Sequence, residues 1–136
     1  MTESKPKLTE SNPKLTESKP TMTEDQFQIS IFWHAWNYYP QTRRLLFHVP
    51  NGGKRNKLEA IKLKQMGVVR GVADIIFYWD NQMYCFELKV QGRDQSEDQL
   101  QWEAIITDQG AKYYLIREFD QFFSIFVSII STSCNK

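Results

Sequence analysis

Two apolar runs separated by a short polar stretch dominate the middle of the chain. Residues 72–79 read VADIIFYW, residues 83–90 read MYCFELKV, and the polar Asp80-Asn81-Gln82 lies between them. Runs of this length, rich in β-branched and aromatic residues and broken by Asp and Asn, predict two β-strands joined by a tight turn. Such a hairpin fixes which side chains share a face, and it therefore constrains the rest of the fold.

Three charged side chains interrupt these apolar runs: Asp74 in the first, and Glu87 and Lys89 in the second. A charge in a buried strand is costly unless it is paired or binds a metal. Because side chains alternate along a strand, Glu87 and Lys89 share a face. A two-residue turn would set Asp74 opposite Glu87, a four-residue turn would set it opposite Lys89, and a three-residue turn would put it on the other face. The sequence leaves both even-numbered turns open.

The residue types of this group favour metal-assisted chemistry on a phosphate. Two close carboxylates repel each other unless a cation lies between them. Their oxygen atoms suit a hard cation such as Mg²⁺ or Mn²⁺. A nearby lysine adds a positive charge for a phosphate or an attacking water molecule. The alternative is a structural ion-pair network within the sheet, since an Asp followed by Glu-x-Lys also arises by chance.

The rest of the chain predicts a small α/β domain with a mixed sheet and helices on both sides. Capping boxes at Thr23-x-x-Gln26, Asn56-x-x-Glu59 and Ser96-x-x-Gln99 begin three helices. The expected elements are a helix over 24–39, a strand over 44–49, a helix over 57–66, the hairpin strands, a helix over 97–109, a strand over 112–116 and a helix over 120–130. In the third helix, Trp102, Ile105, Ile106 and Gln109 are expected to share one face.

The two ends of the chain differ from this core. Residues 1–22 repeat a seven-residue unit with a proline in each copy and almost nothing apolar, which predicts a disordered tail before a domain over 23–131. The late apolar run over 122–130 is too short to span a bilayer, and the N-terminus lacks an apolar signal-peptide core. The two cysteines have no metal-ligand spacing, which fits a reduced cytosolic setting.

Positive charge is concentrated in one segment. Residues 43–70 hold eight Lys and Arg against Glu59 alone, whereas residues 71–136 hold five basic and ten acidic residues. This distribution predicts a cationic face for a polyanion, and the alternative is a solvated basic helix without a partner. The VPNGG turn inside the segment is flanked by His48 and Arg55, which could contact phosphate.

At these residues the sequence resembles a known group of enzymes. Asp74 followed by Glu87-x-Lys89 resembles the PD-(D/E)XK, or restriction-endonuclease-like, nucleases. The stretches EDQFQ, HVPNGGKR, GVVRGVAD, FELK and SEDQLQWEAIITDQGAKYYLI resemble the virus-type replication-repair nuclease (VRR-NUC) branch, from about residue 24 to residue 120. One departure is Ala73, which stands where many members have proline.

The resemblance implies a metal site. It makes Asp74 and Glu87 the metal-binding carboxylates, with the backbone carbonyl of Leu88 completing the ligand set. Lys89 would then orient or activate the attacking water and steady the phosphate.

The resemblance also adds two residues to the catalytic set. Gln99 matches a glutamine at the head of the following helix, and Glu24 matches an acid in the first helix. Each has a local alternative, because Gln99 is N3 of a capping box and Glu24 is an acid in a first helical turn, where the helix dipole favours it.

The implied function is that of a metal-dependent DNA endonuclease that uses Mg²⁺ or Mn²⁺ and selects junctions, flaps or other branched DNA. The resemblance also implies a restriction-endonuclease-like core, a bacterial or phage source and a cytoplasmic location. It further implies a lone domain that could pair as a homodimer. The alternative is a catalytically inactive DNA-binding module of the same fold, against which the intact Asp74, Glu87 and Lys89 argue. The expected DNA-binding positions are Arg43, Arg44, His48, Asn51, Lys54, Arg55, Lys57 and Arg70.

Overall fold

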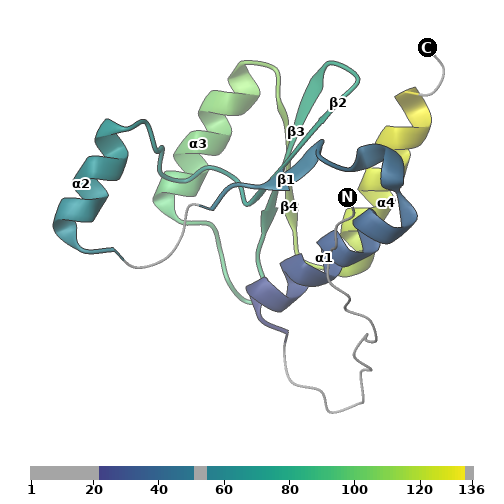
Figure 1. Ribbon diagram of the computed structural model, residues 1–136, viewed down its shortest axis with the longest axis horizontal. Helices are drawn as coiled ribbons and strands as arrows, with labels where there is room; N and C mark the ends of the chain where they lie inside the picture. Colours follow the sequence, from purple (N-terminus) through teal and green to yellow (C-terminus); the bar gives the residue numbers. More distant parts are fainter. Residues whose placement is uncertain (1–21, 51–54, 134–136) are drawn as a thin grey trace.

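A four-stranded mixed sheet with helices on both faces forms the centre of the molecule (Figure 1). The computed structural model describes residues 22–50 and 55–133, so that the predicted tail, apart from Met22, lies outside the described residues. The elements are α1 (Glu24–Tyr38), η1 (Pro40–Thr42), β1 (Leu46–His48), α2 (Lys57–Gln65), β2 (Ile75–Trp79), β3 (Gln82–Leu88), α3 (Glu97–Asp108), β4 (Lys112–Ile116) and α4 (Phe119–Ser133). This order confirms the predicted fold class.

The hairpin has the two-residue turn. Trp79 pairs with Gln82 and Ile75 with Phe86 in an antiparallel register, so Asp80 and Asn81 form the turn. Both turn residues have positive φ, 52° and 65°. Asp and Asn tolerate this conformation better than most residues, and two such residues suit the twist of a β-hairpin.

The sheet carries its strands in the order β1-β2-β3-β4, with β1 and β2 antiparallel and β4 parallel to β3. A parallel neighbour needs a crossover, and α3 supplies it. The crossover brings the N-terminus of α3 close to the end of β3, which is where the charged residues of the hairpin lie.

Two apolar layers cover the sheet. Phe77, Phe86, Phe122 and Phe126 are fully buried between the sheet and the helices α1 and α4. Ring centroids 4.8 to 5.3 Å apart join Phe122 to Phe86 and Phe126. A smaller layer lies under α3, where Trp102 and Ile106 pack near Cys85. Each buried aromatic side chain contributes about 1.5 to 3 kcal/mol, so the α1/α4 layer dominates folding.

Several predicted boundaries and one predicted face differ from the structure. The first strand is shorter than 44–49, because η1 and a positive φ of 73° at Arg44 turn the chain just before Leu46. The hairpin strand expected from residue 72 begins at Ile75. Ile105 was expected beside Trp102 and Ile106 but is 64% exposed, because the face of α3 that packs on the small layer carries only Trp102 and Ile106.

No helix within the described ranges is both long and apolar enough to cross a membrane. The longest apolar one, α4, instead buries Phe122, Phe126, Ile129 and Ile130 in the main core.

Candidate active site

The carboxyl groups of Asp74 and Glu87 meet where β2 begins and β3 ends. Continuing the observed register by one residue from the Ile75–Phe86 pair sets Asp74 opposite Glu87. Asp74 Oδ2 accepts a hydrogen bond of 2.9 Å from the backbone N–H of Leu88, which ties the first carboxyl to the strand that carries the second. The predicted juxtaposition of the two acids is therefore present.

Glu87 is the most unusual side chain of this group. Its side chain carries an ionisable carboxyl group, and yet the residue is only 1% exposed. Its Oε1 atom is buried and has no hydrogen-bond partner among the described residues. Buried polar atoms in folded proteins are almost always paired, so an unpaired carboxyl oxygen indicates a site that a further group completes.

Burial and mutual repulsion keep a proton on this pair. Burial and the nearby Asp74 carboxyl raise the pKa of Glu87 to about 8, although the charge of Lys89 lowers it. Burial also raises the pKa of Asp74, with Glu24 adding to the effect and the Leu88 N–H opposing it. Two such acids cannot both ionise cheaply without a cation.

Gln99 connects α3 to Glu87 and also caps the helix. Its Oε1 accepts from the backbone N–H of Ser96 at 2.8 Å, and its Nε2 donates to Glu87 Oε2 at 2.8 Å. Because the Ser96 N–H can only donate, the amide oxygen must face it, and the NH₂ group must face Glu87. The capping box is therefore confirmed, and the same contact aims the amide at the acid.

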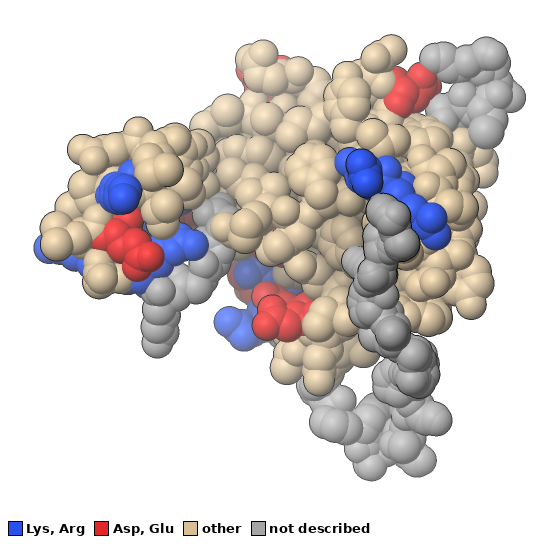
Figure 2. Space-filling model, in the orientation of Figure 1, with Lys and Arg blue, Asp and Glu red and all other residues tan. Residues whose placement is uncertain are grey.

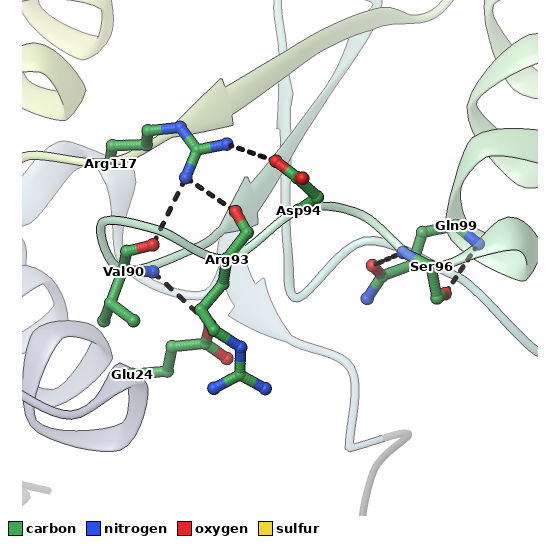
Figure 3. Close-up of polar contacts among 7 residues, drawn as sticks. All are labelled: Glu24, Val90, Arg93, Asp94, Ser96, Gln99 and Arg117. Carbon is green, nitrogen blue, oxygen red and sulfur yellow. Dashed lines mark hydrogen bonds and ion pairs between the residues drawn. The ribbon is translucent and has the colours of Figure 1, made fainter.

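Glu24 and Lys89 lie beside the pair. Glu24 is the first residue of α1, and its Oε2 accepts from the backbone N–H of Val90 at 3.4 Å (Figure 3). Its charge acts on Asp74, just as the charge of Lys89 acts on Glu87. Lys89 directly follows β3, where its N–H donates to the carbonyl of Ile116 at 3.0 Å.

His48 supports the backbone of Asp74. Its Nδ1 lies 2.8 Å from the Asp74 carbonyl, which also accepts from the Val49 N–H at 3.0 Å. A carbonyl only accepts, so His48 carries its proton on Nδ1 in this contact. The contact gives the expected DNA-binding histidine a second role, because it fixes the chain at the site.

A glycine allows α3 to sit close to this region. Gly71 has φ +84°, and a Cβ atom built there would lie 2.2 Å from the backbone oxygen of Asp98, in the first turn of α3. The neighbouring Arg70 pairs with Asp98 at 3.2 Å. The segment before Asp74 therefore packs against the first turn of α3, the helix that carries Gln99. A side chain at position 71 would prevent this close packing.

The described DNA-binding candidates lie on different elements of the fold. Lys57 lies on α2, which buries none of its residues, and the face drawn in Figure 2 shows basic atoms over α2, near the C-terminal end of α1 and in a further group at the lower centre. Arg43 packs at that end, with two hydrogen bonds to the Trp36 carbonyl and its guanidinium 4.6 Å from the Trp36 ring. Arg44 and Arg55 are exposed, and Arg70 pairs with Asp98. Asn51 and Lys54 lie outside the described residues.

Three supporting residues are absent from the sequence-based set. Gln95 donates to Glu103 at 3.0 Å and to the Tyr113 hydroxyl at 3.2 Å. Burial raises the pKa of Tyr113, and the charge of Glu87 adds to the rise. Arg117 binds the loop between β3 and α3. Neither Gln95 nor Arg117 belongs to a sequence motif, and Tyr113 has the pattern of an ordinary tyrosine in a strand. Only the folded structure identifies these three residues as neighbours of the site.

In the metal-free protein, the free energy of unfolding should fall as the pH rises from about 4.5 toward about 8. Over this range the folded state holds the Glu87 proton and the unfolded state releases it, so rising pH favours unfolding. Urea denaturation in a chelator measures this, with Glu87→Gln as the matched control that lacks the titrating group. A wild-type curve that runs parallel to the control curve across this range would contradict the assignment.

Comparisons with known proteins identify the fold. No protein-family model matches the sequence, and no curated protein matches it. Among solved structures, the chain is similar to a VRR_NUC domain protein, with a TM-score of 0.60 and 19% identity over 79% of this chain and 87% of that chain. At this identity the likeness establishes the fold. It confirms the expected restriction-endonuclease-like architecture and supports the resemblance noted in the sequence.

Proposed function

We propose that this chain, which has the fold of a VRR_NUC domain protein, is a metal-dependent nuclease that hydrolyses phosphodiester bonds in DNA. The observation that carries the proposal is the acid pair: Asp74 and the buried Glu87 share a site at the end of β3, and one oxygen of Glu87 has no partner among the described residues. This favours a site that binds a further group over a structural ion network, because buried carboxyl oxygens in folded proteins are rarely left unpaired.

The residues present fit a divalent cation. Within residues 22–50 and 55–133, no three His, Cys, Asp or Glu side chains form a metal-binding group, so the protein ligands would be two carboxylates and a carbonyl. Leu88 is suited to supply the carbonyl, because the N–H and C=O groups of a strand residue point to the same side and its N–H faces Asp74. Bound Mg²⁺ or Mn²⁺ would lower the pKa of a water molecule and offset charge on the phosphate.

The side chains around the acids have distinct roles in this proposal. Lys89 supplies a positive charge next to Glu87, suited to holding a phosphate oxygen or an attacking water. Gln99 holds one oxygen of Glu87, which leaves the other oxygen for a metal ion. Glu24 accepts from the backbone N–H of Val90 and so holds the chain directly after Lys89.

The preferred DNA is a branched one, and the active assembly is a homodimer. On the face drawn in Figure 2 the basic atoms are spread over several groups, from α2 to the C-terminal end of α1, which suits contacts with more than one duplex segment. Contacts of this kind follow the phosphate backbone without reading sequence. Light scattering of the protein alone and with a four-way junction tests the assembly.

One experiment tests the function. Labelled linear, flapped, forked and four-way DNAs are incubated with Mg²⁺, with Mn²⁺ and with a chelator, using wild-type protein and Asp74→Asn. We expect metal-dependent cleavage of at least one branched DNA by the wild type alone. Binding without cleavage in every metal would favour the inactive DNA-binding module instead.

The α2 lysines are expected to add affinity without sequence preference. Lys57, Lys62 and Lys64 are exposed on α2. Replacing all three with Ala should weaken binding to every DNA alike and lower the slope of log K against log salt by about one for each phosphate that the variant no longer neutralises. Filter binding over a salt series measures it, with Lys112→Ala as a single-lysine control. Weaker binding to one sequence only would show that α2 reads bases.

A further inference from the structure

The loop from Val90 to Gln95 joins the two halves of the candidate site. Lys89 precedes it directly, and Ser96, which follows it, caps the helix that aims Gln99 at Glu87. The loop has little structure of its own: Gly92 has φ +86°, and the Arg93 N–H reaches the Val90 carbonyl at 3.2 Å. The conformation of the loop therefore depends on its contacts with other elements of the fold.

One side chain holds this loop at two points. Nη1 of Arg117, just after β4, donates to the Val90 carbonyl at 3.2 Å and to the Arg93 carbonyl at 2.7 Å (Figure 3). The other terminal nitrogen lies 3.5 Å from Asp94 Oδ1, but Asp94 is 95% exposed, so that ion pair is weak. The two carbonyls are the contacts that set the loop.

Arg117 is itself held in place. Its backbone N–H donates to Gln121 Oε1 at 2.8 Å, and Gln121 Nε2 donates to the Leu115 carbonyl at 3.0 Å. The preceding residue, Ile116, accepts the Lys89 N–H. The backbone that carries the guanidinium is therefore fixed at the junction between β4 and α4. From there the guanidinium reaches the loop that follows β3.

The Val90 peptide is held from the opposite side as well. Its N–H donates to Glu24 of α1, while its carbonyl accepts from Arg117. The backbone is thus fixed on both sides of the Lys89 side chain. The N–H of Lys89 is bound to the Ile116 carbonyl, and the next residue, Val90, is bound by Glu24 and Arg117. A free loop would let Lys89 move away from Glu87.

We propose that Arg117 is a positioning residue, which keeps Lys89 directed at the acid pair by clamping the loop that follows it. This inference rests on the proposed nuclease function. An arginine suits this clamp because its planar guanidinium holds its N–H donors in fixed directions: Nη1 serves both carbonyls, and the other terminal nitrogen faces Asp94. The ammonium group of a lysine is a point charge on a flexible stem and lacks this fixed geometry.

The test is a double-mutant cycle under single-turnover conditions with Mn²⁺ and a cleavable DNA. Arg117→Ala should lower the cleavage rate by about 10- to 100-fold, the scale of a misplaced catalytic group. The Kd for DNA and the Mn²⁺ concentration at half-maximal rate should stay unchanged. In a Lys89→Ala background, Arg117→Ala should add little further loss, because both changes remove the same contribution.

Two further variants separate the clamp from folding and from charge. Arg117→Lys keeps the charge and the aliphatic stem, and it should fold normally and retain an intermediate rate. Asp94→Ala removes only the exposed ion pair and should behave as wild type. Equal losses from Arg117→Ala with and without Lys89, or a wild-type rate in Arg117→Ala, would overturn the inference while leaving the nuclease intact. A wild-type protein that cleaves no DNA would overturn the nuclease proposal and this inference with it.

Discussion

Glu87→Gln is expected to abolish metal-dependent cleavage and to stabilise the metal-free protein at alkaline pH. The amide has the size of the acid, and its oxygen can still accept from Gln99. Its NH₂ group can donate to Asp74, which removes the repulsion between the two carboxyls. Cleavage should fall by about 1,000-fold or more, the upper range for losing one group that stabilises charge in a transition state.

Thermal melts with and without Mn²⁺ measure the expected change in the stability of Glu87→Gln. Mn²⁺ at about 100 times its Kd should stabilise the wild type by about 2.7 kcal/mol. Glu87→Gln should melt above the metal-free wild type at alkaline pH and should gain little from Mn²⁺. Lys112→Ala, at the far end of β4, is a neutral control. A variant that is less stable than wild type at every pH and still cleaves DNA would show that Glu87 is purely structural.

Lys89→Ala should lower turnover by about 100-fold or more, the scale of a positioned catalytic group. DNA binding should persist, because the basic groups over α2 and beside α1 lie elsewhere. The pKa of Glu87, about 8 with Lys89 present, should rise further in the variant, because the lysine charge lowers it. Metal-free stability should therefore drop chiefly above about pH 8, where wild-type Glu87 is ionised.

Single-turnover kinetics, filter binding and melts on this variant separate the possibilities. Slow cleavage with normal binding supports a catalytic lysine. Normal cleavage together with lower stability would assign Asp74, Glu87 and Lys89 to a structural ion network.

The two strands of the hairpin and the tight turn between them were predictable from local chemistry, although the sequence left the register open between a two-residue and a four-residue turn. Asp80 and Asn81 accept positive φ, so the shorter of the two even-numbered turns forms, and alternation along β3 then places Glu87 toward α3. The capping boxes of α1 and α3 were equally readable, since each involves residues three apart in the sequence. These features depend on short stretches of chain and need no knowledge of distant contacts.

The parts that escaped prediction depend on long-range contacts. Nothing near Arg117 in the sequence marks it, because its partners Val90 and Arg93 come from a loop that the crossover brings to it. Charge counting grouped Arg43 with the α2 lysines, although Arg43 packs on Trp36 and α2 lies at the other end of the molecule. Likewise, only the folded structure shows that one oxygen of Glu87 has no hydrogen-bond partner among the described residues.

Metal-dependent cleavage is the central claim, and one assay tests it most directly. Wild-type protein and Glu87→Gln are each incubated with a labelled four-way DNA junction in Mn²⁺ and in chelator. We expect cut products from the wild type in Mn²⁺ alone, with Glu87→Gln binding the junction and leaving it intact. Equal cleavage by both proteins, or cleavage that continues in the chelator, would contradict the account.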